Sequence, residues 1–171
     1  MNNVIFSTPS ESYPVPHIIY AGFITEIPAE KRKTDQSHFF KIITSTGPFY
    51  CYYGSLDAAK KARNSLGSMM SENKPAVFKS GNEIVDVSKI VSFTKVLTLK
   101  KPENGYTHAI LIVPETVSVE RSAQIWLHYK SEETARNARK ALFATILSIY
   151  QKGSSISEKE MDMEATECQS E

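Results

Sequence analysis

Hydrophobic and polar positions follow the same order of patterns twice along the chain. In the first half, apolar or alternating runs typical of strands lie at 4–7, 17–27, 38–45 and 48–54. A helical period follows at 56–71. The second half repeats this order, with strand patterns at 76–79, 89–99, 107–113 and 123–130 and a helical period at 132–151. Each half is therefore predicted to form four strands followed by one helix.

The two halves also share residues at a constant offset of 76. The segment FYCYYGSLDAAKKARNSL at 49–66 aligns with IWLHYKSEETARNARKAL at 125–142. Identities fall on both the strand and the helix of this segment, at Tyr53/Tyr129, Ser55/Ser131, Ala59/Ala135, Ala62/Ala138, Arg63/Arg139 and Leu66/Leu142. Self-similarity at a fixed spacing is the signature of an internal repeat.

These patterns predict an α+β fold of two tandem β-β-β-β-α repeats, at 1–74 and 75–152. We expect two four-stranded antiparallel sheets, each backed by one helix and related by a pseudo-twofold axis, which together make one compact domain. Ser55 and Ser131 are expected to cap the two helices, because a serine hydroxyl accepts from the free amides of a first turn.

Charge is distributed unevenly along the chain. Residues 1–152 hold 19 basic and 13 acidic residues, whereas residues 153–171 hold six acidic residues and one basic residue. Gly153 is expected to end the second helix, and 153–171 to form a disordered acidic tail. The mildly basic folded part hints at a polyanionic partner.

Candidate catalytic chemistry is sparse. Cys51 alternates with Phe49 and Tyr53 on one strand face, where a small buried hydrophobe is expected. The sequence has no GxGxxG, GxxxxGK[ST], GxSxG or HExxH motif. The four histidines lack the short spacing of a metal pair. We therefore predict no catalytic residue, no cofactor and no metal, and do not expect an enzyme.

Aromatic residues on the fourth strands are more informative. Side chains on a strand alternate between its two faces. Phe49, Cys51 and Tyr53 are expected to face the helix, so that Tyr50 and Tyr52 face the other way; Trp126 and His128 hold the matching positions in the second half. Such rings can stack on unpaired bases. Alternatively, the two ringed faces pack on each other or form a dimer interface.

Basic residues accompany these strands. The connections between the second and third strands carry Lys31, Arg32 and Lys33 in the first half and Lys100 and Lys101 in the second, and Lys41 lies on the third strand. Cations beside aromatic strands are the pattern expected of a groove that follows a nucleic-acid backbone. Ordinary solvated loops explain them equally well.

The order of elements over 4–151 resembles that of the PUR-repeat and whirly families, which bind single-stranded nucleic acids. The resemblance rests on topology and on no sequence motif. It implies binding on sheet surfaces through aromatic and basic side chains, for which Tyr50, Tyr52 and Trp126 are the matching candidates.

We therefore expect a non-catalytic module that binds single-stranded DNA or RNA. The alternative is a protein-interaction or structural module that oligomerises through its aromatic sheet faces or through extra apolar residues on the second helix, Phe143, Leu147 and Tyr150. No apolar run approaches the length of a membrane span, so no membrane partner is expected. The two cysteines, Cys51 and Cys168, suggest no disulfide and hence a cytoplasmic location.

Overall fold

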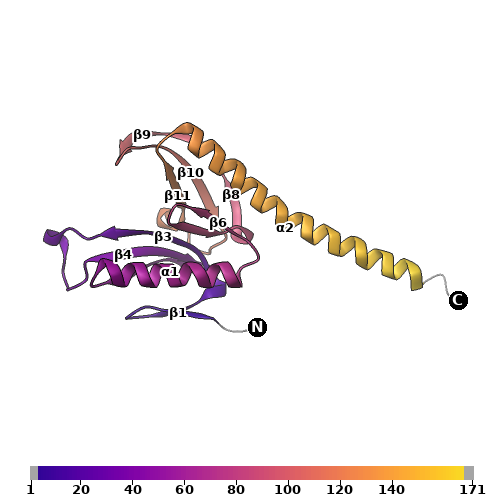
Figure 1. The fold of residues 1–171 in the computed structure, drawn as a ribbon, viewed down its shortest axis with the longest axis horizontal. Helices are drawn as coiled ribbons and strands as arrows, with labels where there is room; N and C mark the ends of the chain where they lie inside the picture. The colour runs from indigo at the N-terminus through magenta and orange to yellow at the C-terminus, as the bar shows by residue number, and fades with distance from the viewer. Residues whose placement is uncertain (1–3, 168–171) are drawn as a thin grey trace.

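The protein is a mixed α+β fold built from antiparallel sheets and two helices (Figure 1). The computed structural model describes the backbone of residues 4–167 and the side chains of residues 4–151 apart from Glu103. The helices are α1 (Leu56–Asn73) and α2 (Glu132–Glu167). The α+β class predicted from the sequence is confirmed.

The largest sheet has five antiparallel strands. Their order is β5 (Gly47–Tyr53), β4 (His38–Thr44), β3 (Ile18–Glu26), β7 (Glu83–Asp86) and β6 (Val77–Ser80). We call it the first sheet. Helix α1 lies along one of its faces (Figure 1).

The second sheet is centred on β10. This strand pairs with β11 on one side and with β8 and then β9 on the other, the four strands being β8 (Ile90–Phe93), β9 (Leu97–Glu103), β10 (Tyr106–Pro114) and β11 (Ile125–Tyr129). The run predicted as one strand at 89–99 is thus broken at 94–96. Across the break the Thr94 amide donates to the Leu111 carbonyl at 3.0 Å, and the Leu111 amide donates to Thr94 Oγ1 at 3.1 Å.

A short hairpin and four 3₁₀ turns make up the rest of the regular structure within residues 4–167. The hairpin pairs β1 (Ile5–Ser7) with β2 (Ser12–Pro14) and forms a two-stranded sheet. The 3₁₀ turns are η1 (Val15–His17), η2 (Ala29–Lys31), η3 (Val87–Lys89) and η4 (Arg121–Ala123).

The prediction of two four-stranded sheets, one from each half, is wrong in the membership of the sheets and, for the first sheet, in the number of strands. The β6–β7 hairpin belongs to the second half of the chain, yet it pairs with β3 of the first half, with Tyr20 opposite Val85 and Ala21 opposite Ile84. A strand pattern fixes which face of a strand is buried but does not fix which neighbour satisfies its edge. A pairing between halves was therefore invisible in the sequence.

The second helix is longer than its pattern predicted. Helix α2 continues through Gly153 to Glu167, past the end predicted at 151. One glycine inside a helix costs only about 1 kcal/mol relative to alanine, and the glutamates and lysines that follow are good helix formers. Residues 168–171 of the predicted tail lie outside the described residues.

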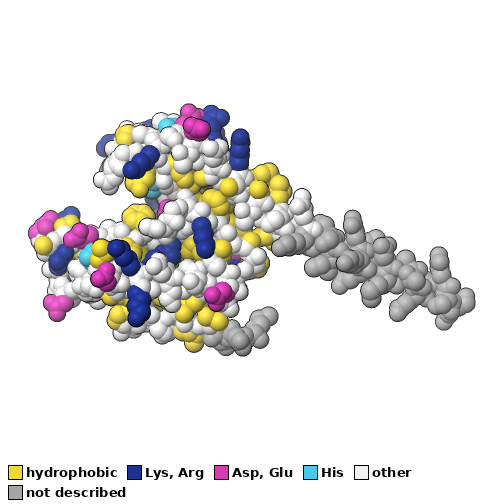
Figure 2. Space-filling model, in the orientation of Figure 1, with side chains coloured by type: hydrophobic (Ala, Val, Ile, Leu, Met, Phe, Trp, Pro, Cys, Tyr) yellow, Lys and Arg dark blue, Asp and Glu magenta, His cyan; other side chains and the backbone are white. Residues whose placement is uncertain are grey.

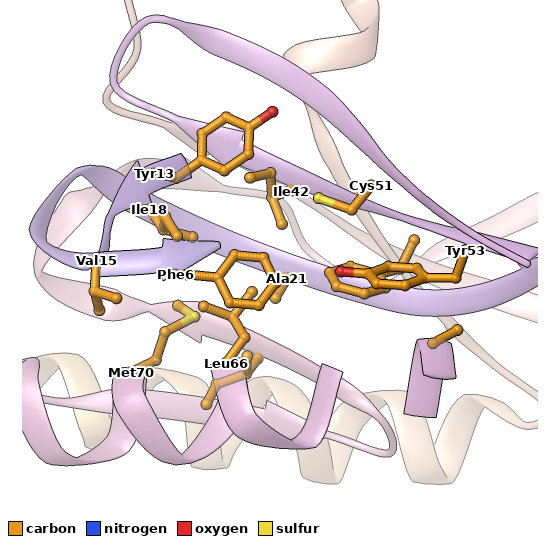
Figure 3. Packing of buried hydrophobic residues seen from close by; sticks show 13 residues of the cluster. Phe6, Tyr13, Val15, Ile18, Ala21, Ile42, Cys51, Tyr53, Leu66 and Met70 are labelled. Carbon is orange, nitrogen blue, oxygen red and sulfur yellow. The ribbon is translucent and has the colours of Figure 1, made fainter. Parts of the chain in front are cut away.

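One buried cluster lies between α1, the β1–β2 hairpin and the first sheet. Leu66 and Met70 of α1 point toward Phe6 of the hairpin (Figure 3). The rings of Phe40 and Tyr53 stack with centroids 5.6 Å apart. Cys51 is buried in this cluster, as the strand alternation predicted.

The other buried cluster lies under α2 and joins the two halves. It contains Ile110, Leu127 and Leu142 from the second half together with Tyr20 and Ile43 from the opposite face of the first sheet. The first sheet is therefore covered on both faces, by α1 on one and partly by the second sheet on the other. Burial of both faces fixes how the two sheets are placed.

Several polar contacts recur in both halves. Arg63 Nε donates to the Gly22 carbonyl at 2.7 Å, and Arg139 Nε donates to the Thr94 carbonyl at 3.1 Å. Ser55 and Ser131 each accept from the amide three residues ahead at 3.2 Å, as predicted for helix caps. The strand histidines are alike too, since His38 Nδ1 lies 2.8 Å from Ser37 Oγ and His108 Nδ1 lies 2.8 Å from Thr107 Oγ1.

Candidate nucleic-acid interface

Three rings form an aromatic cluster on the face of the first sheet opposite α1. Phe39 of β4 lies opposite Tyr52 of β5, with ring centroids 5.6 Å apart, and its ring is 5.8 Å from that of Tyr50. Tyr50 and Tyr52 are 44% and 39% exposed, whereas Cys51 and Tyr53 between and beyond them are buried. The face assignment made from the sequence is confirmed. We call Phe39, Tyr50 and Tyr52 the first ring cluster.

A second ring cluster lies on the second sheet. Trp126 and His128 of β11 stack at 6.5 Å with an interplanar angle of 22°, and Tyr106 of β10 lies 6.0 Å from His128. Trp126 and Tyr106 are each 38% exposed. Burial lowers the pKa of His128, which favours the neutral imidazole, although a hydrogen bond to the Trp126 backbone acts in the opposite direction. Each cluster thus has two exposed rings and one half-buried ring, which is Phe39 in the first cluster and His128 in the second.

A cavity of about 300 Å³ opens between the two sheets beside the second ring cluster. The surface is hollowed between the lobe that carries β9 and the lobe that carries β3 (Figure 2). The cavity is lined by side chains of both sheets and of the β9–β10 turn, namely Phe23, Glu83, Leu99, Lys101, Asn104, Tyr106 and His128. We call it the inter-sheet cavity.

Glu83 supplies the carboxyl group of this cavity. The side chain is 9% exposed and lies on β7, and its Oε1 accepts a hydrogen bond from the Tyr20 hydroxyl. Burial raises the pKa of Glu83 to about 7, although Tyr20, Arg63 and Lys41 act in the opposite direction. A Cβ at Gly22 would lie 2.9 Å from the Tyr20 hydroxyl oxygen, so a glycine there leaves room for this contact.

Arg63 connects α1 to the wall of the same cavity. Its guanidinium is buried and donates to three carbonyls, those of Gly22 at 2.7 Å, Ala21 at 2.9 Å and Asn82. These carbonyls flank Tyr20 and Glu83 in the chain. Arg63 therefore fixes the backbone that positions both side chains.

The cations predicted in the second half lie on a strand instead of a loop. Strand β9 runs to Glu103 because Asn104 and Gly105, with φ of 53° and 77°, form the two-residue turn to β10. Successive strand residues point to opposite faces. Lys101 lines the inter-sheet cavity, while Lys100 is exposed and does not line it.

The cations predicted in the first half lie at the exposed β3–β4 connection. Lys31 ends η2 and Lys33 follows it, both exposed. Arg32 is held locally, since its Nη2 lies 3.2 Å from Glu26 Oε1 and its Nε donates to the Ile27 carbonyl at 2.8 Å. The structure does not bring these three residues into the lining of the cavity.

Lys41 joins the two sheets. Its Nζ donates to the carbonyls of Ser122 at 3.1 Å and Gln124 at 3.4 Å and lies 5.7 Å from the centre of the Tyr20 ring. Burial lowers the pKa of this amine. Because the ammonium already binds carbonyls of this chain, we leave Lys41 out of the proposed interface.

Sequence reasoning missed several cavity residues. Phe23, Glu83, Asn104 and Tyr106 were not singled out. The Asn-Gly pair was a usable signal, because it predicts a tight hairpin that places Tyr106 at the start of a strand. No sequence signal brings Phe23 and Glu83 to His128, since that meeting depends on how the two sheets pack.

Comparison with known proteins yields no family, no curated protein sequence and no solved structure that matches this chain. Within the part of the chain that the structure describes, no group of three or more His, Cys, Asp or Glu residues could hold a metal ion. Among the described helices, none is both long and apolar enough to cross a membrane.

Proposed function

We propose that the protein binds single-stranded DNA or RNA and does not catalyse a reaction. The observation that carries this proposal is the pair of exposed ring clusters, one on each sheet, formed by Phe39, Tyr50 and Tyr52 and by Tyr106, Trp126 and His128. Every unpaired base has a flat face that can stack on such rings, with about 1–3 kcal/mol per base.

Charge supports the same function. Residues 1–152 carry 19 basic and 13 acidic residues, a balance of +6. Lys101 lines the same cavity as Tyr106 and His128 of the second ring cluster. Lys31 and Lys33 are exposed in the β3–β4 connection, at the end of the first sheet. Cations at such positions can contact phosphates while bases stack on the rings.

We further propose that 1–74 and 75–152 are copies of one unit related by a pseudo-twofold axis, as in the PUR-repeat and whirly families. The recurring contacts of Arg63 with Gly22 and of Arg139 with Thr94 support this proposal. A repeated unit offers two equivalent ring clusters to one strand. The free thiol of Cys51 fits the cytoplasmic location that belongs to the same proposal.

Fluorescence anisotropy of a labelled oligo-dT strand tests the function. We expect binding at low salt that weakens steeply as salt rises, and weaker binding of a duplex of equal length. Tyr50→Ala with Tyr52→Ala, or Trp126→Ala alone, should each reduce affinity roughly tenfold, whereas Val91→Ala, at a side chain 68% exposed elsewhere, should not. Absence of binding at low salt would contradict the proposal.

A second candidate function is favoured by helix α2. Its Phe143 and Leu147 are 49% and 40% exposed, an apolar stripe beside the contact of Phe143 with Phe93. Such a stripe suits the interface of an oligomer. Sedimentation of the full chain tests it: a dimer that Leu147→Glu converts to a monomer would support this function, and a monomer at all concentrations would exclude it.

A further inference from the structure

We propose that the inter-sheet cavity holds one base of the bound strand and that Glu83 selects a base whose edge carries N–H donors, guanine above all. The inference deepens the proposed function, because it names the ligand of one site within the same interface. It rests on the walls of the cavity, on the chemistry of Glu83, the one carboxyl group among the described lining residues, and on Lys101 at the rim.

The walls of the cavity suit a flat ring. Phe23 approaches from the first sheet, and Tyr106 and His128 approach from the second. Phe23 is 53% exposed even though it is aromatic, which leaves its ring available to a ligand. A volume of about 300 Å³ lies at the lower end of small-molecule sites and is large enough for one base with part of its sugar.

Glu83 presents an acceptor to that ring. Its Oε1 already accepts from Tyr20, and no group in the described part of the chain donates to Oε2. Above pH 7 the carboxyl group of Glu83 is mostly ionised, and an ionised carboxyl group accepts hydrogen bonds and donates none. Because Glu83 itself is buried, its ionised carboxyl group favours a ligand that brings donors.

Bases differ in what they offer this oxygen. Guanine carries two adjacent donor groups, its ring N–H and its amino group, which match the two oxygens of one carboxylate. Uracil and thymine flank their single ring N–H with two carbonyls, so an acceptor would face an acceptor. A buried polar group left unpaired lowers affinity more than a missing apolar contact does, which makes the discrimination strong.

Lys101 places the phosphate. Its ammonium borders the same cavity as the rings, so a nucleotide whose base contacts Glu83 can direct its phosphate toward the amine. A base without phosphate should therefore bind more weakly than the nucleotide.

Calorimetric titration of the full chain with 5′-GMP and 5′-UMP at pH 8, where Glu83 is mostly ionised, tests the inference. We expect GMP to bind at least tenfold more tightly than UMP, and Glu83→Gln to reduce that ratio to about threefold or less. Phe23→Ala, at an exposed side chain that should not affect folding, should weaken GMP binding about tenfold. Glu72→Gln removes an exposed carboxyl group on α1 and should leave both affinities unchanged.

An oligo-dT strand with and without one central dG separates this inference from the function beneath it. If the dT strand binds but neither the central dG nor GMP gains affinity over its competitor, the base site is wrong and the single-strand function stands. If GMP binds selectively but neither strand binds, the site is a nucleotide pocket and the single-strand function is wrong. Equal binding of GMP and UMP overturns the role of Glu83.

Discussion

Tyr20 and Glu83 are joined by a hydrogen bond from the tyrosine hydroxyl to Glu83 Oε1. The two residues come from different halves of the chain and meet because β7 pairs with β3. Burial raises the pKa of Glu83 to about 7 and raises that of Tyr20 well above its ordinary value. Both groups are therefore protonated more readily in the folded chain than in the unfolded chain.

The raised pKa of Glu83 makes folding stability depend on pH. Between pH 4.5 and about 7 the folded chain keeps a proton that the unfolded chain has lost, so stability falls as pH rises through this range. The expected loss is about 2–3 kcal/mol. Glutamine does not titrate in this range, so the stability of Glu83→Gln should lack this dependence on pH.

Urea unfolding of both chains at pH 5 and pH 7.5 measures the effect. The contributions of other titrating groups to the free energy of unfolding cancel when the variant and the parent chain are compared at the same pH. The stability of Glu83→Gln relative to the parent chain should rise by about 2–3 kcal/mol between the two pH values. A relative stability that does not change with pH would show that Glu83 titrates near its ordinary value.

Arg63 should contribute more to stability than Arg139, although the two occupy matching positions. Arg63 is buried and donates to three carbonyls, whereas Arg139 is half-buried, donates to one carbonyl and lies 5.4 Å from the centre of the Phe93 ring. We expect Arg63→Met to cost about 2–4 kcal/mol and Arg139→Met about 1 kcal/mol in urea unfolding. Equal costs would contradict this difference in contacts.

The thiol of Cys51 should be unreactive in the folded chain. Burial raises its pKa to about 12, which leaves roughly one thiolate in ten thousand molecules at pH 8. In a Cys168→Ser chain, an aromatic disulfide reagent should label Cys51 only after urea is added. Labelling without urea at the rate of a small free thiol would place Cys51 outside the core.

The salt dependence of binding should distinguish Lys101 from its neighbour Lys100. For single strands, the slope of log affinity against log salt changes by about 0.7 for each phosphate contact. Lys101→Ala should reduce the slope by about that amount, and Lys100→Ala, which lies on the opposite face of β9, should leave it unchanged. The reverse result would place the strand on the other face of the second sheet.

Much of the fold could be predicted from the periodicity of hydrophobic residues and from the residues that cap helices and form turns. The runs predicted at 48–54 and 56–71 match β5 and α1 within two residues at each end. Alternation also correctly separated buried Cys51 from exposed Tyr50 and Tyr52. These features depend on a local rule, the direction in which successive side chains point. Structure that depends on such local rules can be predicted from a single sequence.

The cavity could not be read in the same way. Phe23, Glu83 and His128 are far apart in the chain and meet because the β6–β7 hairpin joins the first sheet while the second sheet packs above it. Lys41 looked like a free surface cation, yet the same packing places Ser122 and Gln124 carbonyls against its amine. Such contacts follow from the docking of two sheets, for which the sequence offers no short-range signal.

The emission of Trp126 tests the central claim most directly, since it is the single tryptophan and lies 38% exposed in the second ring cluster. Titration with an unlabelled oligo-dT strand at low salt should quench this emission in a saturable way, and added salt should restore it. Emission that stays unchanged at every strand concentration, with the chain shown to be folded, would contradict stacking of bases on the sheets.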